Sequence, residues 1–289
     1  MKLSDMHLRD PYILPYDNKY YLYFSPGKYA WSGYEGFYCT VSEDLVNWSE
    51  PVKCFTPPEG FWATDNYWAP EVHYYNGRFY LFASFYAKGH MRAVQIMASD
   101  SPVGPFEVWS CPITPNHWMC LDGTFYIEDG KPYMVFCHEW LQTYDGEVCA
   151  VELSEDLKQP IGEPKLLFKA SESKWASNKD VNGYITDGPF LYKTADGKLI
   201  MTWSSLDESR YSVGVAYSEN GSLFGEWKHC ENTLSDIDGG HGMIFKSYDG
   251  HLYFTMHYRE EPNSLEHPCL IEFEEILDEP FIAIKKIIK

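Results

Sequence analysis

RDPYILPYDNKYYLYFS, at residues 9–25, is the stretch that decides the fold, because its pattern returns four more times along the chain. Each copy has a polar or glycine-rich entry, a short apolar run, a turn and an aromatic-rich strand. The other copies are APEVHYYNGRFYLFASF from Ala69, LDGTFYIEDGKPYMVFCHE from Leu121, TDGPFLYKTADGKLIMTWSS from Thr186 and GGHGMIFKSYDGHLYFTMH from Gly240. Repetition of this kind indicates that one small structural unit is used several times.

The spacing of the copies predicts a β-propeller. Their starts are separated by roughly 50–65 residues, the length of a four-stranded blade, and the five units fill the chain of 289 residues. Each turn holds an Asp or Asn beside Lys or Gly, in the segments DNK, NGR, EDGK, ADGK and YDGH. Such residues supply the positive φ angles of tight hairpins. We therefore predict that every copy is a β-hairpin.

Further strands are expected between the copies. The candidates are GFYCTVSEDLVNW, RAVQIMASDSPVGPFEVW, EVCAVELSEDL and YSVGVAYSENGSLFGEW. Helical periodicity is weak and no linker rich in Pro or Ser interrupts the chain, so we predict an all-β fold with residues 1–289 forming a single five-bladed β-propeller. The alternative is a two-sheet β-sandwich, which also uses many short strands but has no reason to repeat one hairpin motif.

Composition limits the classes of partner. The chain has 23 Lys and Arg against 42 Asp and Glu, a formal charge of −19, which disfavours binding to nucleic acid or to an anionic membrane surface. A neutral sugar meets no such repulsion. Aromatic residues make up 17% of the chain, and they favour strands and also stack on sugar rings. A small oligosaccharide is thus the expected partner.

The sequence also indicates a cellular location. The amino-terminal MKLSDMHLRDPYI lacks the apolar segment of an export signal, and no stretch approaches the roughly 18 apolar residues of a membrane span. The eight cysteines are scattered without a C-x-x-C pair, which is typical of reduced structural thiols. We therefore expect a cytoplasmic protein.

Acidic residues recur where the first strand of each copy begins. The residues at these positions are Asp10, Glu71, Asp122, Asp187 and, in the last copy, His241. Because the innermost strands of a propeller line one central channel, we expect these side chains to converge near its axis. Carboxylates buried together raise at least one pKa. Inverting glycoside hydrolysis uses one protonated carboxyl group and one carboxylate, roughly 6.5–9.5 Å apart. Acids on opposite sides of a propeller channel could provide such a pair.

The segments RDPYI, WAPEV, LDGTFY, TDGP and GGHG resemble, in this order, the motifs of glycoside hydrolase family 43 over nearly the whole chain. The resemblance implies a five-bladed propeller and an inverting enzyme without a required cofactor. It implies action on arabinose- or xylose-containing saccharides, as an α-L-arabinofuranosidase, a β-xylosidase or an endo-arabinanase. It also implies that Asp10 is the general base and that Asp122 orients the general acid and tunes its pKa.

Two residues are candidates for the general acid. The family usually has Glu in an EGP segment, whereas this chain has Asp187 in TDGP. Asp is one methylene shorter, and a misplacement of about 1 Å can lower the rate by around 10²-fold. Glu139 in FCHEW is the alternative, because its apolar neighbours Phe136 and Trp140 favour the raised pKa of an acid catalyst.

Other residues are candidates for substrate or ion binding. Trp68, Trp140 and Trp203 are predicted to form a stacking wall beside the axial motifs, with core packing as the alternative for Trp203, and Glu71 is predicted to contact substrate. Arg259 resembles an Arg that approaches the sugar in parts of the family, and a surface ion pair is the alternative. His241 resembles an axial His beside calcium or another ion, with a core histidine as the alternative.

Two other function classes compete with hydrolysis. A non-catalytic sugar-binding propeller would keep the aromatic residues but would not need repeated axial carboxylates. A propeller glycoside phosphorylase would need a cluster of Arg, Lys or His for phosphate, which the motifs do not contain. Because a cytoplasmic enzyme would meet short imported oligosaccharides, we expect removal of terminal residues over internal cleavage.

Overall fold

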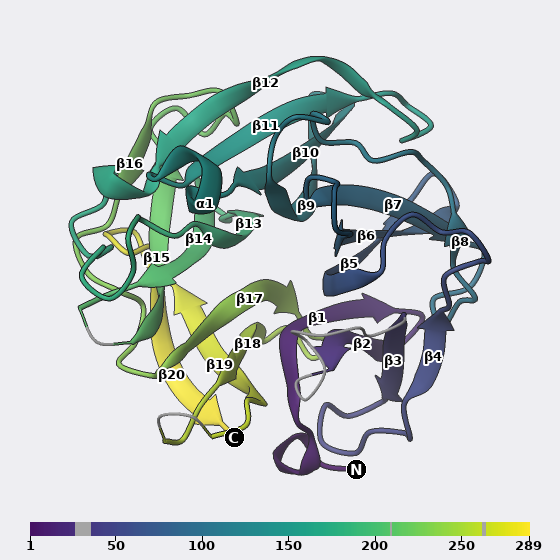
Figure 1. The fold of residues 1–289 in the computed structure, drawn as a ribbon. Coiled ribbons are helices and arrows are strands. Elements are labelled where there is room, and N and C mark those ends of the chain that lie inside the picture. The colour runs from purple at the N-terminus through teal and green to yellow at the C-terminus, as the bar shows by residue number, and fades with distance from the viewer. Residues whose placement is uncertain (27–35, 209, 262–263) are drawn as a thin grey trace.

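The five predicted hairpins form the inner part of a closed ring of five antiparallel sheets in the computed structural model of the protein (Figure 1). The structure describes residues 1–26, 36–208, 210–261 and 264–289. Each sheet has four strands that follow one another in the sequence, ordered from the axis to the rim. The predicted five-bladed β-propeller is confirmed, and the alternative β-sandwich is wrong.

The blades contain the following strands. Blade 1 has β1 (Leu8–Tyr16), β2 (Lys19–Pro26), β3 (Phe37–Ser42) and β4 (Val52–Phe55). Blade 2 has β5 (Asp65–Tyr75), β6 (Arg78–Tyr86), β7 (Ala93–Ser99) and β8 (Glu107–Val108). Blade 3 has β9 (Cys120–Glu128), β10 (Lys131–His138), β11 (Glu147–Leu153) and β12 (Pro160–Lys169). Blade 4 has β13 (Asp187–Lys193), β14 (Leu199–Leu206), β15 (Tyr211–Ser218) and β16 (Trp227–His229). Blade 5 has β17 (Gly239–Lys246), β18 (Leu252–Tyr258), β19 (His267–Glu275) and β20 (Ile282–Ile288).

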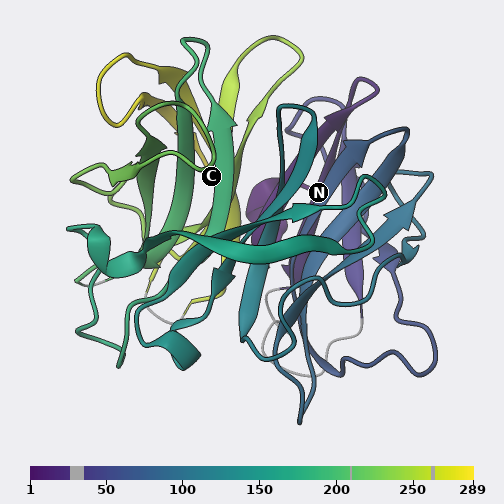
Figure 2. The ribbon, with the colours of Figure 1, turned by 90° about the horizontal axis from the view of Figure 1, so that it is seen from above.

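Among the described residues, helical structure is limited to short connections. They are the 3₁₀ turns η1 (Leu3–Asp5) and η3 (Ala170–Glu172) and the helix α1 (Trp140–Thr143). In the part of the chain that the structure describes, none of the helices has the length and apolar character needed to cross a membrane. In the view turned by 90°, most strands run between the two ends of the ring, whereas long teal strands of one blade cross the front of the view (Figure 2).

The inner hairpins use the turn residues that the sequence indicated. In blade 1 the turn residues Asp17 and Asn18 have φ angles of 49° and 56°, and in blade 2 Asn76 and Gly77 have 45° and 85°. Left-handed conformations at both central positions give a hairpin a twist that matches its strands. The turns therefore join consecutive strands without splaying the sheet.

The hydrophobic core lies between neighbouring blades. Between blades 2 and 3, for example, Val94 and Ile96 of β7 pack in one buried cluster with Met134 and Phe136 of β10. Complete burial of such a side chain contributes about 1.5–3 kcal/mol. Each sheet thus buries both of its faces, which explains why its strands are rich in apolar and aromatic residues.

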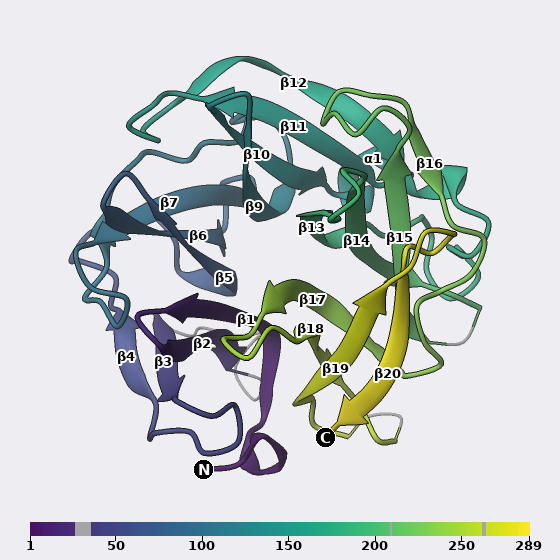
Figure 3. The same ribbon diagram turned by 180° about the vertical axis from the view of Figure 1, so that it is seen from behind.

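The ring closes where blade 5 meets blade 1, without exchange of strands. The Leu8 N–H donates to the Glu266 carbonyl at 3.1 Å. The Asp10 N–H donates to Nδ1 of His257 at 3.1 Å. Both chain ends lie beside this seam (Figures 1 and 3). The seam therefore brings the first motif of the chain against the last blade.

A β-bulge at the start of every innermost strand positions the site. In blade 1 the pairing skips from Arg9 with Ser25 to Tyr12 with Tyr23. The same skip occurs in the other four blades. In each bulge one residue is left-handed: Asp10 (φ 53°), Ala69 (48°), Asp122 (56°), Gly188 (49°) and His241 (47°). Bulges near active sites re-aim side chains, and positive φ is uncommon for residues other than glycine. The five bulges therefore form a repeated device at one end of the axis.

The bulges correct the predicted equivalence of the acidic residues. Asp10, Asp122 and His241 do share one position, but in blade 2 that position holds Ala69, and Glu71 lies two residues further along β5. In blade 4 the position holds Gly188, and Asp187 pairs with Ser204 as Arg9 pairs with Ser25. The prediction was wrong at these two positions because the sequence motifs do not reveal where the bulge begins.

Candidate active site

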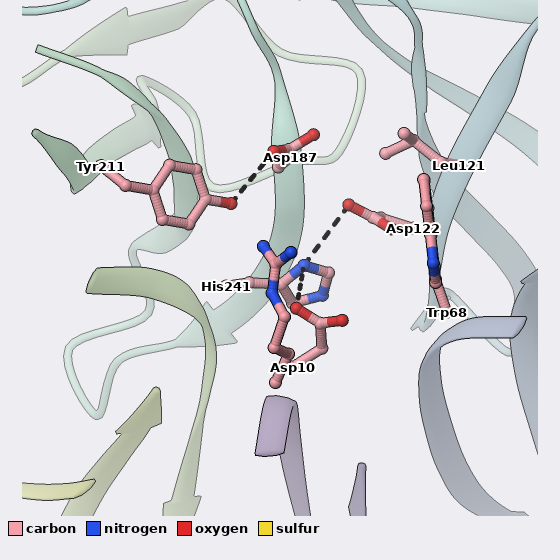
Figure 4. A pocket seen from close by; sticks show the side chains of 8 residues that line it. Asp10, Trp68, Leu121, Asp122, Asp187, Tyr211 and His241 are labelled. Carbon is pink, nitrogen blue, oxygen red and sulfur yellow. Dashed lines mark hydrogen bonds and ion pairs between the residues drawn. The ribbon is translucent and has the colours of Figure 1, made fainter. Parts of the chain in front are cut away.

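A small cavity of about 60 Å³ opens at the end of the axis where the innermost strands begin (Figure 4). It is lined by Arg9, Asp10, Trp68, Leu121, Asp122, Asp187, Tyr211 and His241. All of these except Tyr211 lie at or directly before a bulge of an innermost strand. The fold thus gathers the predicted Asp10, Trp68, Asp122, Asp187 and His241 into one cavity.

His241 lies between two carboxylates. Its Nδ1 is 3.4 Å from an oxygen of Asp10 and 3.4 Å from an oxygen of Asp122, as the dashed lines in Figure 4 show. Burial by itself lowers the pKa of His241, but the surrounding Asp122, Asp10 and Asp187 outweigh it and raise that pKa. The ring is therefore favoured as an imidazolium that bridges the two acids.

Asp10 is held as a carboxylate. The Ser25 hydroxyl donates to its Oδ2 at 2.8 Å. Burial would raise the pKa of Asp10, but the positive charges of His241 and Arg9, with smaller contributions from His257 and Ser25, hold it below the ordinary value. Asp10 is consequently ionised at neutral pH and can accept a proton.

His257 is a neutral ring that holds the backbone of Asp10. Its Nδ1 accepts the N–H of Asp10, so that nitrogen carries no proton. Burial, together with the charge of Arg9, lowers the pKa of His257 well below the ordinary value. Its ring is stacked on Tyr211, with centroids 5.7 Å apart and an interplanar angle of 15°. This packing fixes the backbone on which the Asp10 carboxylate is mounted.

Asp122 joins blades 3 and 4 at the cavity. Its Oδ2 accepts the N–H of Gly188 at 2.9 Å, and its own N–H donates to the Ser84 hydroxyl at 2.8 Å. Burial raises the pKa of Asp122, and the neighbouring Asp10 adds to this, while His241 and the Gly188 N–H oppose it. The Asp122 carboxylate therefore accepts a hydrogen bond from blade 4, and its negative charge raises the pKa of Asp187.

The pKa of Asp187 is raised, whereas that of Asp10 is lowered. It lies half-buried in the cavity wall, and the Tyr211 hydroxyl donates to its Oδ2 at 3.1 Å. Loss of water around the carboxyl group, followed by the charge of Asp122, raises the pKa of Asp187 to about 7. Asp187 therefore retains its proton over much of the range in which Asp10 is ionised.

Gly188 allows this close arrangement. A Cβ atom at this position would lie 2.8 Å from ring atoms of His241. The φ of +49° is also one that residues with side chains rarely adopt. The glycine after Asp187 therefore permits the His241 ring to approach the backbone of blade 4.

An ionised and a protonated carboxyl group in one enclosed cavity form a pair suited to general base and general acid catalysis. Asp10 can take a proton from water and Asp187 can give one to a leaving group. Arg9 adds a fixed positive charge beside them, because its pKa is raised by Asp10 and other acids even though burial opposes this. The site can thus transfer protons in both directions without a metal ion in either step.

Glu139, the other candidate acid, is outside the cavity lining. It lies directly before α1, buried, and its Oε1 forms an ion pair with Nη1 of Arg92. Burial raises the pKa of Glu139 above its ordinary value, although the positive charge of Arg92 opposes this. The Arg92 guanidinium also lies 4.4 Å from the ring centroid of Trp68. Glu139 and Arg92 therefore support the cavity wall from behind.

Two predicted tryptophans are not in the cavity. Trp203 is fully buried between Trp175 and Phe168, with ring centroids 4.6 and 5.5 Å away. Its predicted contact with substrate is wrong and its alternative, core packing, is correct, because its side chain on β14 faces the layer between blades 3 and 4. Trp140 is half-buried in α1 beside Glu139 and does not line the cavity.

Arg259 and Glu71 are also away from the cavity. Arg259 donates to the Glu266 carboxylate at 2.6 Å, which matches the ion-pair alternative. The Glu71 carboxylate forms a hydrogen bond with Nε2 of His73 at 3.1 Å. Both residues lie further along β5 than Trp68, which lines the cavity. Their predicted substrate contacts are not supported. Glu71 lies beyond the bulge of β5, and Arg259 follows β18, which is not an innermost strand.

Sequence reasoning missed Arg9, Leu121 and Tyr211. Arg9 and Leu121 share the register position of Asp187, so a correct alignment of the bulges would have identified them. Tyr211 begins β15, a strand that is not innermost, and no motif marked it. Its role became visible only through its contact with Asp187.

A cation beside His241 would have to share the ring with two acids. Nδ1 of the ring faces the carboxylates of Asp10 and Asp122 at 3.4 Å, so this side of the ring is already engaged. Over the described ranges of the chain, no group of three or more His, Cys, Asp or Glu side chains is arranged to hold a metal ion. The ion beside His241 stays a prediction.

Comparisons with known proteins identify the family of the chain. Residues 3–273 match the family described as Glycosyl hydrolases family 43. The solved structure of an endo-arabinase from Bacteroides thetaiotaomicron VPI-5482 is 41% identical, with a TM-score of 0.88, covering 96% of this chain and 98% of that one. Probable arabinan endo-1,5-alpha-L-arabinosidase C of Aspergillus clavatus is 26% identical over 251 residues, 80% of this chain and 71% of that protein.

A shorter match involves extracellular endo-alpha-(1->5)-L-arabinanase 1 of Bacillus subtilis (strain 168). It is 27% identical over 111 residues, 34% of this chain and 34% of that protein. The matched region thus spans about a third of that relative's length. The names of these three proteins refer to arabinan, and a solved structure of an endo-1,4-beta-xylanase from Bacteroides thetaiotaomicron VPI-5482 is also similar, at 27% identity and a TM-score of 0.80, covering 98% of this chain and 96% of that one.

Proposed function

Because the chain belongs to glycosyl hydrolases family 43, we propose that it hydrolyses arabinose- or xylose-containing oligosaccharides with inversion at the anomeric carbon. The observation that carries the proposal is the cavity in which Asp10 and Asp187 have opposite proton preferences. Inverting hydrolysis needs such a pair on opposite sides of the scissile bond.

Asp10 is the proposed general base. The carboxylate takes a proton from a water molecule as the water oxygen bonds to the anomeric carbon. At the same time Asp187, the proposed general acid, gives its proton to the leaving oxygen as the glycosidic bond breaks. The products are a sugar hemiacetal of inverted configuration and a free hydroxyl group, and the two carboxyl groups have exchanged protonation states.

The contacts of the two candidate acids favour Asp187. Asp187 faces the cavity with Tyr211 on one oxygen, whereas the Glu139 carboxyl group is engaged by Arg92 behind the wall. Because Glu139 does not line the cavity, its carboxyl group is not placed to protonate a leaving oxygen there. Asp187 therefore fits the acid role in spite of its shorter side chain.

The remaining cavity residues are proposed to orient these groups. Asp122 places its charge beside Asp187 and so keeps that acid protonated, while the His241 imidazolium holds Asp10 and Asp122 at fixed positions. Trp68 offers an aromatic surface for the sugar ring, and Arg9 offers hydrogen-bond donors. Because Asp10 and Asp187 can carry out both proton transfers, we propose that the reaction needs no cofactor.

Arabinan-derived oligosaccharides are the first substrates to test. The support is the 41% identity, over nearly the full length of both chains, to a protein described as an endo-arabinase. The proposed cytoplasmic location has separate support from the eight cysteines, all of them free thiols and all but Cys111 buried, as suits a reducing compartment.

A direct experiment tests this function. The protein is incubated with aryl α-L-arabinofuranoside, aryl β-D-xyloside and linear arabino-oligosaccharides, and the first-formed anomer is followed by proton NMR. Inverted product without added phosphate is expected. Retained configuration, or turnover only with inorganic phosphate, would contradict the proposal, and binding of the sugars without any turnover would favour a non-catalytic propeller.

A further inference from the structure

We propose that a second hollow, on blade 2 beside the catalytic cavity, binds another pentose residue of the same oligosaccharide, with Trp62 as its stacking surface. The inference rests on the proposed function, because it concerns substrates longer than one sugar. The hollow encloses about 290 Å³ and is lined by Trp62, His90, Met91, Ala93, Pro112, Thr114, Pro115 and Asn116.

The hollow lies at the same end of the ring as the catalytic cavity. Trp62 comes shortly before β5, residues 90–93 connect β6 to β7, and the segment Pro112–Asn116 leads toward β9. Since antiparallel neighbours alternate in direction, the start of β5, the end of β6 and the start of β9 share one end of the propeller. Trp68 and Asp122 are at the starts of β5 and β9, so both sites open on one face.

One short segment separates the two sites. Met91 and Ala93 line the hollow, and Arg92 between them points to the other side, where it contacts Trp68 and Glu139. This alternation is that of an extended chain, whose successive side chains point in opposite directions. The layer between the hollow and the cavity is therefore the Arg92 guanidinium stacked on the Trp68 ring. An oligosaccharide bound in the cavity and extending past Trp68 would place its next sugar residues at the hollow.

The indole of Trp62 is fixed before any ligand arrives. Its Nε1–H donates to Oε1 of the buried Gln95 at 2.6 Å, and Nε2 of Gln95 donates to the Ser110 carbonyl at 2.6 Å. The ring also contacts Phe85 at a centroid distance of 6.4 Å and His90 at 5.6 Å. A rigid aromatic surface loses little conformational entropy when it binds, which favours stacking on a sugar ring.

The chemistry of the hollow suits a neutral ligand. Among the described residues that form it, none is Asp, Glu, Lys or Arg, although the chain as a whole has a charge of −19. The polar groups it offers include the Asn116 amide and the His90 ring beside the apolar Met91 and Pro115. A mostly apolar hollow with a few hydrogen-bonding groups matches a sugar, which has an apolar face and hydroxyl edges.

Chain-length dependence tests the proposal. We would measure kcat/KM of wild type, Trp62→Ala and Trp109→Ala for an aryl pentoside and for oligosaccharides from the disaccharide to the hexasaccharide. Trp109 is the matched control, because it is also a half-buried tryptophan of blade 2 whose indole donates to a protein oxygen, the Asp156 carbonyl at 2.6 Å, and it lines neither site. We expect W62A to lose about tenfold for the longer substrates and less than twofold for the aryl pentoside.

The opposing outcomes are distinct. An equal loss for all substrates in W62A, or no loss at any length, overturns the proposal. Trp62→Phe keeps an aromatic face and should retain most of the preference for long substrates, which separates stacking from a folding defect.

If wild type hydrolyses none of the substrates, the proposed function fails, and calorimetry with the arabino- and xylo-hexasaccharides then tests the hollow by itself. Weaker binding of either one by W62A supports the hollow, and equal or absent binding by wild type and W62A refutes it.

Discussion

The N–H of Gly188 donates to Oδ2 of Asp122 at 2.9 Å, so the residue after the candidate acid in blade 4 is tied to the central acid of blade 3. The same glycine leaves room for the His241 ring of blade 5, which a Cβ atom would approach to 2.8 Å. Three blades thus meet at one backbone position. A small change there should disturb the acid, its neighbour and the bridging histidine together.

Replacing Gly188 with Ala tests this meeting point. The new Cβ would displace the His241 ring, and a shift of about 1 Å near reacting groups should lower kcat/KM by around 10²-fold or more. Gly162→Ala is the matched control, since Gly162 has a φ of +77° but nothing within 4 Å of its added Cβ. Both variants should lose roughly 1–2 kcal/mol from backbone strain, measured by denaturant unfolding. Equal activity losses in the two variants would show that strain alone, and not the His241 contact, matters.

The identity of the general acid is tested by leaving-group dependence. Asp187→Asn should reduce hydrolysis of natural oligosaccharides by about 10³-fold or more, and that of a 2,4-dinitrophenyl glycoside far less, because a good leaving group needs no proton. Glu139→Gln breaks the ion pair with Arg92 and should lower stability by roughly 3–5 kcal/mol, with similar rate losses for both substrates. The opposite pattern in the two variants would assign the acid role to Glu139.

The pH profile of kcat/KM should be bell-shaped. Activity requires a protonated Asp187, whose pKa is raised to about 7, so it falls as the pH rises through about 7. It also requires an ionised Asp10, whose pKa lies below the ordinary 3.8, so the acidic limb should lie below pH 4. Tyr211→Phe removes a hydrogen bond that favours the charged Asp187 and should move the basic limb to higher pH. A basic limb unchanged by Y211F and by D187N would belong to another group.

Ser25 should matter for both stability and the acidic limb. Its hydroxyl donates to Asp10 at 2.8 Å and accepts the N–H of Ala69 at 2.8 Å, so it joins blades 1 and 2. Ser25→Ala leaves a buried N–H without its acceptor, at about 1–3 kcal/mol, and raises the pKa of Asp10, which moves the acidic limb to higher pH. Ser205→Ala is the control, since Ser205 is fully buried and its hydroxyl has no hydrogen-bond partner among the described residues. Equal effects of S25A and S205A on the midpoint of thermal unfolding would contradict the assigned role.

Removal of metal ions should leave activity unchanged. In the proposed reaction Asp10 and Asp187 carry out both proton transfers, so dialysis against EDTA is expected to alter kcat/KM by less than twofold. Thermal unfolding should be equally unaffected. A large loss that calcium restores would revive the prediction of an ion beside His241.

The fold could be predicted because its signals are local. The five hairpins needed only apolar runs, turn residues and their repetition, each of which is a property of consecutive residues. The same motifs pointed to Asp10, Asp122, Asp187, Trp68 and His241, and the resemblance to family 43 agreed with the family match. The choice between Asp187 and Glu139 was not local, since it depends on Arg92, which lies 47 positions before Glu139 in the chain.

The sequence by itself determined that five hairpin units close into a ring and that acids begin several of them, because repetition and turn chemistry are set by neighbouring residues. Only the tertiary structure decided which of those side chains face the opening. The reason is the bulge in each innermost strand, where one left-handed residue turns Asp10, Asp122 and His241 to the same side and leaves Glu71 further along the axis. Tyr211, Arg9 and Trp62 acquired their places through contacts with residues distant in the chain, Asp187, Glu266 and Gln95, which no single motif contains.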